Sequence, residues 1–133
     1  MISAKVRLFR VIVPVGDIEA ATRFYQALLG DAGRRVARGR HYFDCGGTIL
    51  ACYDPRADGD DVDARPNQEN LYFAVENLEN AFERARGATG AAAGGRVDDR
   101  IETRPWGERS FYMSDPFGNP LCFVDAATVF TGA

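Results

Sequence analysis

The chain carries the same pattern of residues twice, at an offset of 60 positions (70 − 10). The two copies are 10–30 (RVIVPVGDIEAATRFYQALLG) and 70–90 (NLYFAVENLENAFERARGATG). Turn residues and apolar residues recur together, at Val15 and Val75, Asp17 and Asn77, Ile18 and Leu78, Ala21 and Ala81, and Gly30 and Gly90. A unit of this size cannot cover its own apolar face, so the two copies are expected to pack against each other. We expect a cleft where their sheets meet, and such clefts are the usual place for a ligand.

Each copy predicts a strand followed by a helix. Residues 6–15 are rich in β-branched side chains and end in a Pro-Val-Gly turn, and Asp17 is a favourable helix cap. Apolar residues then recur at three- and four-residue spacing until Gly30, which predicts one amphipathic helix. The elements expected in the second copy are a strand over Leu71–Val75, a cap at Asn77 and a helix that ends at Gly87.

Three short strands are expected after each helix. They are Arg34–Ala37, 41–44 and Thr48–Tyr53 in the first copy, with Gly46-Gly47 as a hairpin turn, and 96–104, Arg109–Ser114 and Pro120–Asp125 in the second. The prediction is one α+β domain over 1–133, made of module one (about 4–54), an acidic linker (55–68) and module two (about 69–126). The small residues of 88–95 predict a flexible surface connection, with a lid as the alternative.

Composition limits the classes of partner. With 46% hydrophobic residues the chain can form a core without metal or disulfide staples, and its three cysteines are expected to be buried thiols. A net charge of -3 and no Lys/Arg-rich run argue against nucleic acid as a partner. The first residues, MISAKVRLFR, lack the apolar run of a signal peptide or membrane span. The expectation is a cytoplasmic protein without a membrane partner.

Three phrases in order carry a family resemblance: VPVGDIEAATRFYQALLG, LYFAVENLENAFERA and RPWGERSFYMSDPFGNPLCFVD. Together they resemble the vicinal oxygen chelate superfamily, which includes glyoxalase I, extradiol dioxygenases, fosfomycin-resistance enzymes and bleomycin-resistance binding proteins. The third phrase is most similar to the bleomycin-resistance branch. The resemblance implies two βαβββ modules whose curved mixed sheets surround a cleft, often completed by a homodimer.

The resemblance also implies where a divalent metal would be held, on the first and last strands of each module. The matching positions here are Arg10, Asn70 and Cys122, with the fourth near Leu50 to Cys52. A guanidinium presents only donors, and thiols do not complete the N/O set that suits these metals. We therefore expect neither a metal nor another cofactor. An enzyme with a diverged metal site around Cys52, Cys122 and His41 is the alternative, although a surface or edge-strand position is the simpler expectation for His41.

The candidate ligand-binding residues are Trp106, Tyr72, Arg10, Asn70, Arg109 and Cys122. Alternation along a strand places Tyr72 on the same face as Asn70, and Trp106 offers a flat ring with one donor. Trp106 is also compatible with a core or dimer seam. The cation of Arg10 needs a partner, either a ligand anion or an internal acid such as Asp125, Asp44 or Glu69.

The expected function is binding or sequestration of a hydrophobic or aromatic small molecule without a metal, similar to antibiotic-resistance binding proteins. Trp106 and Tyr72 would stack on the ligand, and Arg10, Asn70 and Arg109 would be polar handles. A metal-dependent lyase, isomerase or dioxygenase of the same superfamily is the runner-up. A degenerate member that acts through protein contacts, with a closed and filled cleft, is the third possibility.

Overall fold

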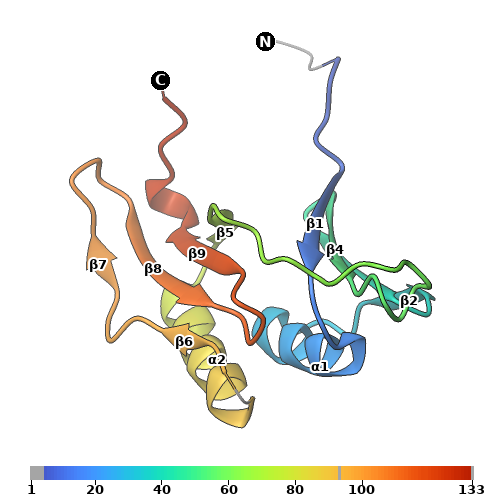
Figure 1. Ribbon diagram of the computed structural model, residues 1–133. Helices are drawn as coiled ribbons and strands as arrows, with labels where there is room; N and C mark the ends of the chain where they lie inside the picture. The colour runs from blue at the N-terminus through green and yellow to red at the C-terminus, as the bar shows by residue number, and fades with distance from the viewer. Residues whose placement is uncertain (1–4, 93, 133) are drawn as a thin grey trace.

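Two similar modules are visible in the computed structural model, which describes residues 5–92 and 94–132 (Figure 1). Module one contains β1 (Arg10–Pro14), α1 (Ile18–Leu29), β2 (Arg34–Ala37), β3 (Arg40–Cys45) and β4 (Thr48–Tyr53). Module two contains β5 (Leu71–Val75), α2 (Leu78–Ala91), β6 (Arg96–Val97), β7 (Glu102–Thr103), β8 (Arg109–Ser114) and β9 (Pro120–Asp125), followed by a 3-10 turn (Ala126–Thr128).

The sheets of the two modules have equivalent strand orders. Module one is ordered β1-β4-β3-β2 and module two β5-β9-β8-β6, with β7 also paired to β8. In each sheet the strand before the helix runs parallel to the last strand, and the other pairs are antiparallel. The helices lie next to each other, and the sheets do not close into a barrel. The predicted α+β fold of two βαβββ modules is confirmed.

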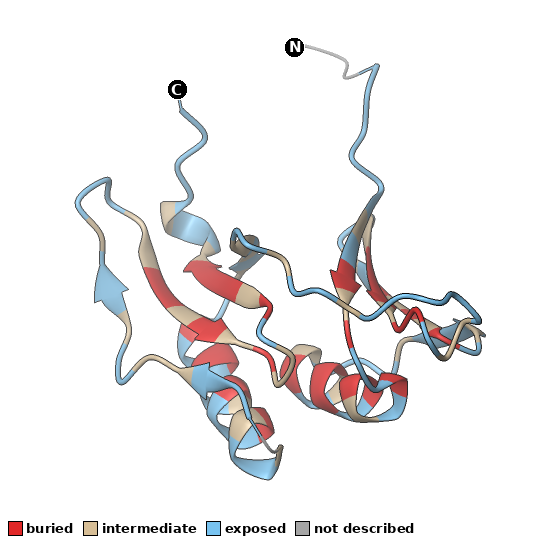
Figure 2. Cartoon of the chain, in the orientation of Figure 1, coloured by how far each residue is buried: buried red, intermediate tan, exposed pale blue. Residues whose placement is uncertain are grey.

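Strand alternation separates two faces of each sheet. One face, here called the helix face, packs on α1 or α2 and carries the buried core, seen as red strand segments and red helix flanks in Figure 2. Its strand residues include Val13, Phe43, Leu50, Phe111 and Phe123. The other face, here called the open face, carries the intervening residues. It is on the open faces that a side chain can meet a ligand without displacing the core.

A buried hydrogen-bond network joins the modules. The Tyr25 hydroxyl on α1 donates to Asp115 Oδ2 at 2.7 Å, in the turn between β8 and β9. Asn119 Nδ2 in the same turn donates to Asp115 Oδ2 at 2.8 Å and to the Pro14 carbonyl at 2.7 Å. Burial, and then the nearby Asp115 charge, raise the pKa of Tyr25, so the phenol stays a donor. The turn predicted from Asp-Pro-Phe-Gly-Asn therefore also fixes how one module meets the other.

Several turn predictions hold at the residue level. Asp17 accepts from the N–H groups of Glu19 and Ala20 as the cap of α1, and Gly30 ends that helix in the left-handed conformation at φ 66°. Gly46 and Gly47 both have positive φ in the β3–β4 hairpin, as a tight turn of this kind requires.

Three element boundaries differ from expectation. β1 starts at Arg10 instead of residue 6, because its parallel partner β4 starts at Thr48, directly after the hairpin, and the residues before Arg10 have no strand to pair with. α2 continues past Gly87 to Ala91, so the segment expected to be a flexible connection or lid is in part helix, anchored by buried Ala88. The strand expected over 96–104 is split into β6 and β7, because the Asp98 carboxylate takes the Tyr112 N–H.

Candidate ligand-binding site

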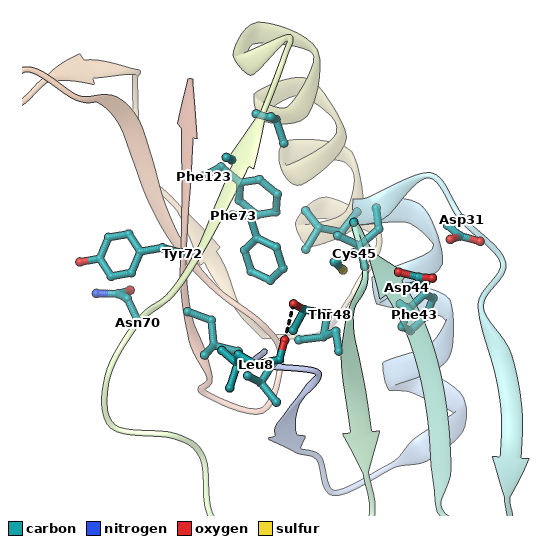
Figure 3. A pocket seen from close by; sticks show the side chains of 18 of the residues that line it. Leu8, Asp31, Phe43, Asp44, Cys45, Thr48, Asn70, Tyr72, Phe73 and Phe123 are labelled. Atoms are coloured by element: carbon teal, nitrogen blue, oxygen red, sulfur yellow. Dashed lines mark hydrogen bonds between the residues drawn. The ribbon is translucent and has the colours of Figure 1, made fainter. Parts of the chain in front are cut away.

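Strand β5 lies at the edge of its sheet and has a hollow on either side. The larger hollow, a groove of about 600 Å³, lies between the modules, and its mainly apolar lining also includes Asp31, Asp44, Thr48, Asn70 and Arg84. Figure 3 shows Phe73 and Phe123 turned into this groove, while Tyr72 and Asn70 project to the other side of β5. Because Phe73 and Phe123 also stack on each other with centroids 4.8 Å apart, the groove continues the core of module two.

The second hollow is a pocket of about 400 Å³ on the open face of module two, here called the open-face pocket. Its lining contains Tyr72, Phe73, Ala74, Trp106, Glu108, Val124, Val129 and Phe130. The structure thus brings together Tyr72 and Trp106, the two residues expected to stack on a ligand. Three separate segments supply the walls: β5 with β9, the loop between β7 and β8, and the chain after β9.

Local structure explains how Trp106 reaches this pocket. The loop between β7 and β8 closes as a tight turn in which Arg104 N–H donates to the Glu108 carbonyl and Gly107 N–H to the Arg104 carbonyl. Gly107 has φ 97°, a conformation that favours glycine. The Trp106 indole N–H then donates to Glu108 Oε1 at 2.8 Å, which fixes the ring over the turn. Trp106 is half-exposed, so the alternative of a core seam is wrong.

Arg10 lies on the open face of module one, outside the open-face pocket. Its guanidinium carbon lies 5.0 Å from the ring centroid of Phe9 and 5.4 Å from that of Tyr42. Among the described residues it forms no ion pair, so the expected internal partner is absent and Asp125 pairs with Arg109 instead. Cation–π contact with two rings takes the place of the carboxylate.

Arg109 was expected to be a polar contact for the ligand, but it lies elsewhere. It lies on the helix face of β8, where its guanidinium pairs with Glu79 at the start of α2 and with Asp125 at 3.0 Å. These two contacts raise the pKa of Arg109. Its charge therefore joins α2, β8 and β9, and Arg109 does not line the open-face pocket.

Cys122 lies on the open face between Tyr72 and Tyr112, its register neighbours on β5 and β8. Burial raises the pKa of the Cys122 thiol to about 11, so the thiolate is scarce at neutral pH. Cys122 does not line the open-face pocket, but it lies beside Tyr72 on the neighbouring strand.

Register shows that Ala51 is the module-one counterpart of Cys122. Ile12 pairs with Ala51 on β4 as Tyr72 pairs with Cys122 on β9, and Ile12 and Tyr72 are separated by the repeat offset of 60 (72 − 12). Cys52 points to the helix face, where burial, with a smaller effect of Asp115, raises its pKa to about 12.

A divalent metal does not fit the four positions that the family resemblance implies. With Ala51 as the fourth, these positions are Arg10, Ala51, Asn70 and Cys122. They offer one amide oxygen and one protonated thiol. Within 5–92 and 94–132 no group of three His, Cys, Asp or Glu side chains could hold a metal ion.

His41 is buried, which contradicts the expected surface or edge position. Its Nε2 lies 2.9 Å from the Ala32 carbonyl, and Arg35 Nε donates to its Nδ1 at 3.3 Å. Because His41 and Cys52 lie on the helix face, they do not meet Cys122 in one site. The diverged metal site considered for these three residues is not assembled.

Glu108, Val129 and Phe130 line the pocket and had not been expected there. Glu108 follows Trp106 at the spacing of a tight turn, which the Trp-Gly pair could have indicated. Val129 and Phe130 approach from beyond the last strand, and no periodicity in the sequence places them. Another unexpected residue is Arg104, whose guanidinium lies 4.7 Å from the Tyr112 ring and bonds to Ser110, beside the pocket.

Residues 7–123 match the sequence model of the Glyoxalase/Bleomycin resistance protein/Dioxygenase superfamily. The chain belongs to this superfamily. Solved structures agree in fold: a glyoxalase-related enzyme from Fulvimarina pelagi has a TM-score of 0.73 at 23% identity, with 96% of this chain and 93% of that chain covered. No curated protein matches the chain.

Two further superfamily structures extend the likeness. A glyoxalase/bleomycin resistance protein from Albidiferax ferrireducens T118 has a TM-score of 0.71 at 25% identity, covering 88% of this chain and 97% of that one. A lactoylglutathione lyase from Agrobacterium tumefaciens has a TM-score of 0.62 at 19% identity, covering 92% and 96%. These similarities show the fold. Among the described helices, none has the length and apolarity needed to cross a membrane.

Proposed function

We propose that this superfamily member binds a hydrophobic or aromatic small molecule in the open-face pocket, without a metal and without making or breaking a bond. The observation that carries the proposal is the meeting of Tyr72 and Trp106 across an apolar hollow of about 400 Å³. Pockets of this size, lined by aromatic side chains with few polar groups, are typical small-molecule sites. The mismatch between a divalent metal and the four open-face positions supports occupancy over metal chemistry.

Each part of the pocket has a distinct role in binding. The Tyr72 and Trp106 rings provide flat apolar surface for a planar ligand, since aromatic pairs gain about 1 kcal/mol beyond area burial. Ala74, Val124 and Phe130 add further apolar lining. A ligand placed there would displace water from apolar surface, which is the main source of affinity.

Intrinsic fluorescence gives a direct test, because Trp106 is the sole tryptophan of the chain. A panel of planar aromatic compounds should change its emission and raise the melting temperature. Trp106→Leu should abolish the tryptophan emission and lower the affinity for the ligand measured by calorimetry. A complete lack of response to the panel, by fluorescence and by melting, would reject the proposal.

A metal-dependent lyase, isomerase or dioxygenase is the second candidate, because the superfamily includes enzymes and a lactoylglutathione lyase shares the fold. Elemental analysis before and after chelator treatment, with melting curves on both samples, separates the two candidates. Binding without catalysis predicts no stoichiometric metal and an unchanged melting temperature. A metal at one per chain, whose removal lowers the melting temperature, would favour the enzyme.

We also propose that two chains associate through the segment before β1 and the open face of module one, which leaves the open-face pocket of module two free. Apolar side chains that stay exposed on this surface include Leu8, Phe9 and Ile12. Monomeric proteins seldom leave such a surface uncovered. Light scattering during size-exclusion chromatography should give twice the chain mass of 14.6 kDa. A mass of one chain at all protein concentrations would contradict the dimer.

A further inference from the structure

The open-face pocket has an apolar lining with one charged side chain. Of the described residues around it, only Glu108 is ionised at neutral pH, and neither Lys nor Arg is among them. Glu108 is half-buried and accepts a hydrogen bond from the Trp106 indole N–H within the pocket lining. A single carboxylate in an aromatic site is a strong constraint on the charge of a ligand.

The Glu108 carboxylate is held in place by donors that leave its charge intact. Oε2 accepts from the Phe130 N–H at 2.9 Å and Oε1 from the Trp106 indole N–H at 2.8 Å. Since hydrogen bonds to the charged form favour it, first that of Phe130 and then that of Trp106 lower the pKa of Glu108. None of the ion pairs formed by the described residues includes Glu108. A full negative charge is therefore fixed at the pocket without a protein cation to balance it.

Three aromatic rings beside this carboxylate remain open to solvent. The exposed fractions are 60% for Tyr72, 49% for Trp106 and 56% for Phe130. The face of an aromatic ring carries negative potential and attracts cations, most strongly for Trp. Rings and carboxylate thus favour the same sign of charge.

We propose that the ligand of the open-face pocket is an organic cation, an aromatic or hydrophobic molecule that carries a protonated amine or a quaternary ammonium. This inference rests on the proposed binding function and specifies its ligand class. The cation would lie against the Trp106 and Tyr72 rings with its charge toward Glu108. A carboxylate already bonded to two donors keeps free lone pairs, so it can accept a further N–H or face an ammonium without losing its present contacts.

The surrounding charges favour cations over anions. The two arginines that flank Glu108 in the sequence are engaged: Arg104 with Asp98, Ser110 and the Tyr112 ring, and Arg109 with Glu79 and Asp125. An anionic ligand would meet Glu108 without a free cation to compensate. The net charge of -3 adds a weak long-range attraction for cations at low salt.

Three tricyclic aromatics of similar shape test the charge preference at neutral pH: 9-aminoacridine as the cation, acridine as the neutral compound and anthracene-9-carboxylate as the anion. Affinity would be measured by quenching of Trp106 fluorescence and by calorimetry. Cation–π contacts and one partly exposed carboxylate should make the cation bind about tenfold more tightly than acridine, with the anion weakest. Equal affinity for cation and neutral compound would overturn the inference while leaving the binding function intact.

The variant Glu108→Gln removes the charge at nearly constant volume. It should lower the affinity for 9-aminoacridine about threefold, since the cation–π contacts remain, and leave that for acridine unchanged. Glu83→Gln removes the same charge from an exposed residue of α2, away from the open face. It should alter the affinity for neither compound. In the unmodified protein, added salt should lower the affinity for the cation more than the affinity for the neutral compound. This readout needs no variant. If none of the three compounds binds, the proposed function itself fails.

Discussion

The two modules share strand order and helix packing, but their open faces are covered by different segments. In module one the acidic linker folds back over β1 and β4, and a hollow of about 770 Å³ lies between it and Ile12, Pro14 and Tyr53. The Tyr53 hydroxyl is bonded to Asp60 of the linker. In module two the chain after β9 borders a smaller aromatic pocket. The repeat has thus kept the scaffold, while non-repeated segments give each open face a different hollow.

The largest difference between the modules is expected at their hairpins. Asp115→Ala in module two would leave four donors without their acceptor: the Tyr25 hydroxyl, the Asn119 amide and the N–H groups of Phe117 and Asn119. Because buried unsatisfied donors are costly, the free energy of unfolding should fall by about 3 kcal/mol or more in urea titrations. Asp44→Ala, at the exposed hairpin of module one, removes one bond to the Gly47 N–H and should cost about 1 kcal/mol. Equal losses would show that the β8–β9 turn does not join the modules.

High pH should lower the free energy of unfolding because module one buries the Cys52 thiol. Burial raises the pKa of Cys52 from 9.0 to about 12, so the folded state holds its proton over a range in which the unfolded state loses it. This stability is present below the ordinary thiol pKa and declines as pH rises toward the folded value, by about 2 kcal/mol near pH 10.5. Urea titrations across this range, with Cys52→Ala as the reference, measure the effect. A Cys52→Ala variant with the same alkaline slope would assign the loss to other groups.

Ligand binding should be sensitive to the tyrosine of one open face only. Tyr72→Ala removes a ring from the pocket of module two and should lower the affinity for an aromatic ligand such as 9-aminoacridine about tenfold. Tyr53→Ala removes a ring from the open face of module one and should leave the affinity unchanged. Trp106 fluorescence reports both variants, since the sole tryptophan is retained. The opposite pattern would move the site to module one.

The smallest expected difference lies at the helix caps. Asp17 accepts two backbone N–H groups at the start of α1, whereas Asn77 accepts only the Asn80 N–H at the start of α2. Asp17→Ala should cost about 1 kcal/mol of unfolding free energy, and Asn77→Ala a few tenths less. Thermal melts of both variants give the ranking. A larger loss for Asn77→Ala would mean that α2 depends on its cap more than its packing indicates.

Local chemistry made much of the fold predictable from the sequence. The cap at Asp17, the stop at Gly30 and the Gly46-Gly47 turn each follow from the conformation that one residue type favours. Boundaries set by partners were harder to predict. The start of β1 depends on where its parallel partner β4 starts, and α2 passes Gly87 because Ala88 packs into the core.

The candidate site was predictable only in part, for the same reason. Alternation placed Tyr72 on the open face, but the register of β4 was needed to show that Ala51, and not Cys52, faces the same way. Glu108 and Phe130 meet through one hydrogen bond across 22 positions (130 − 108) without a shared periodic pattern. Contacts of that kind arise from tertiary structure and leave no local trace in the sequence.

The segment after β9 makes entry to the pocket independent of the two sheets. Val129 and Phe130 belong to no strand, and the nearby anchors are the Phe130 N–H bond to Glu108 and the Thr128 hydroxyl, which accepts from the Arg109 N–H. Segments with few buried contacts and exposed hydrogen bonds open at much lower free energy than a core strand. A ligand of this pocket could therefore exchange through local opening of the segment 128–130, on a timescale separate from unfolding of the sheets.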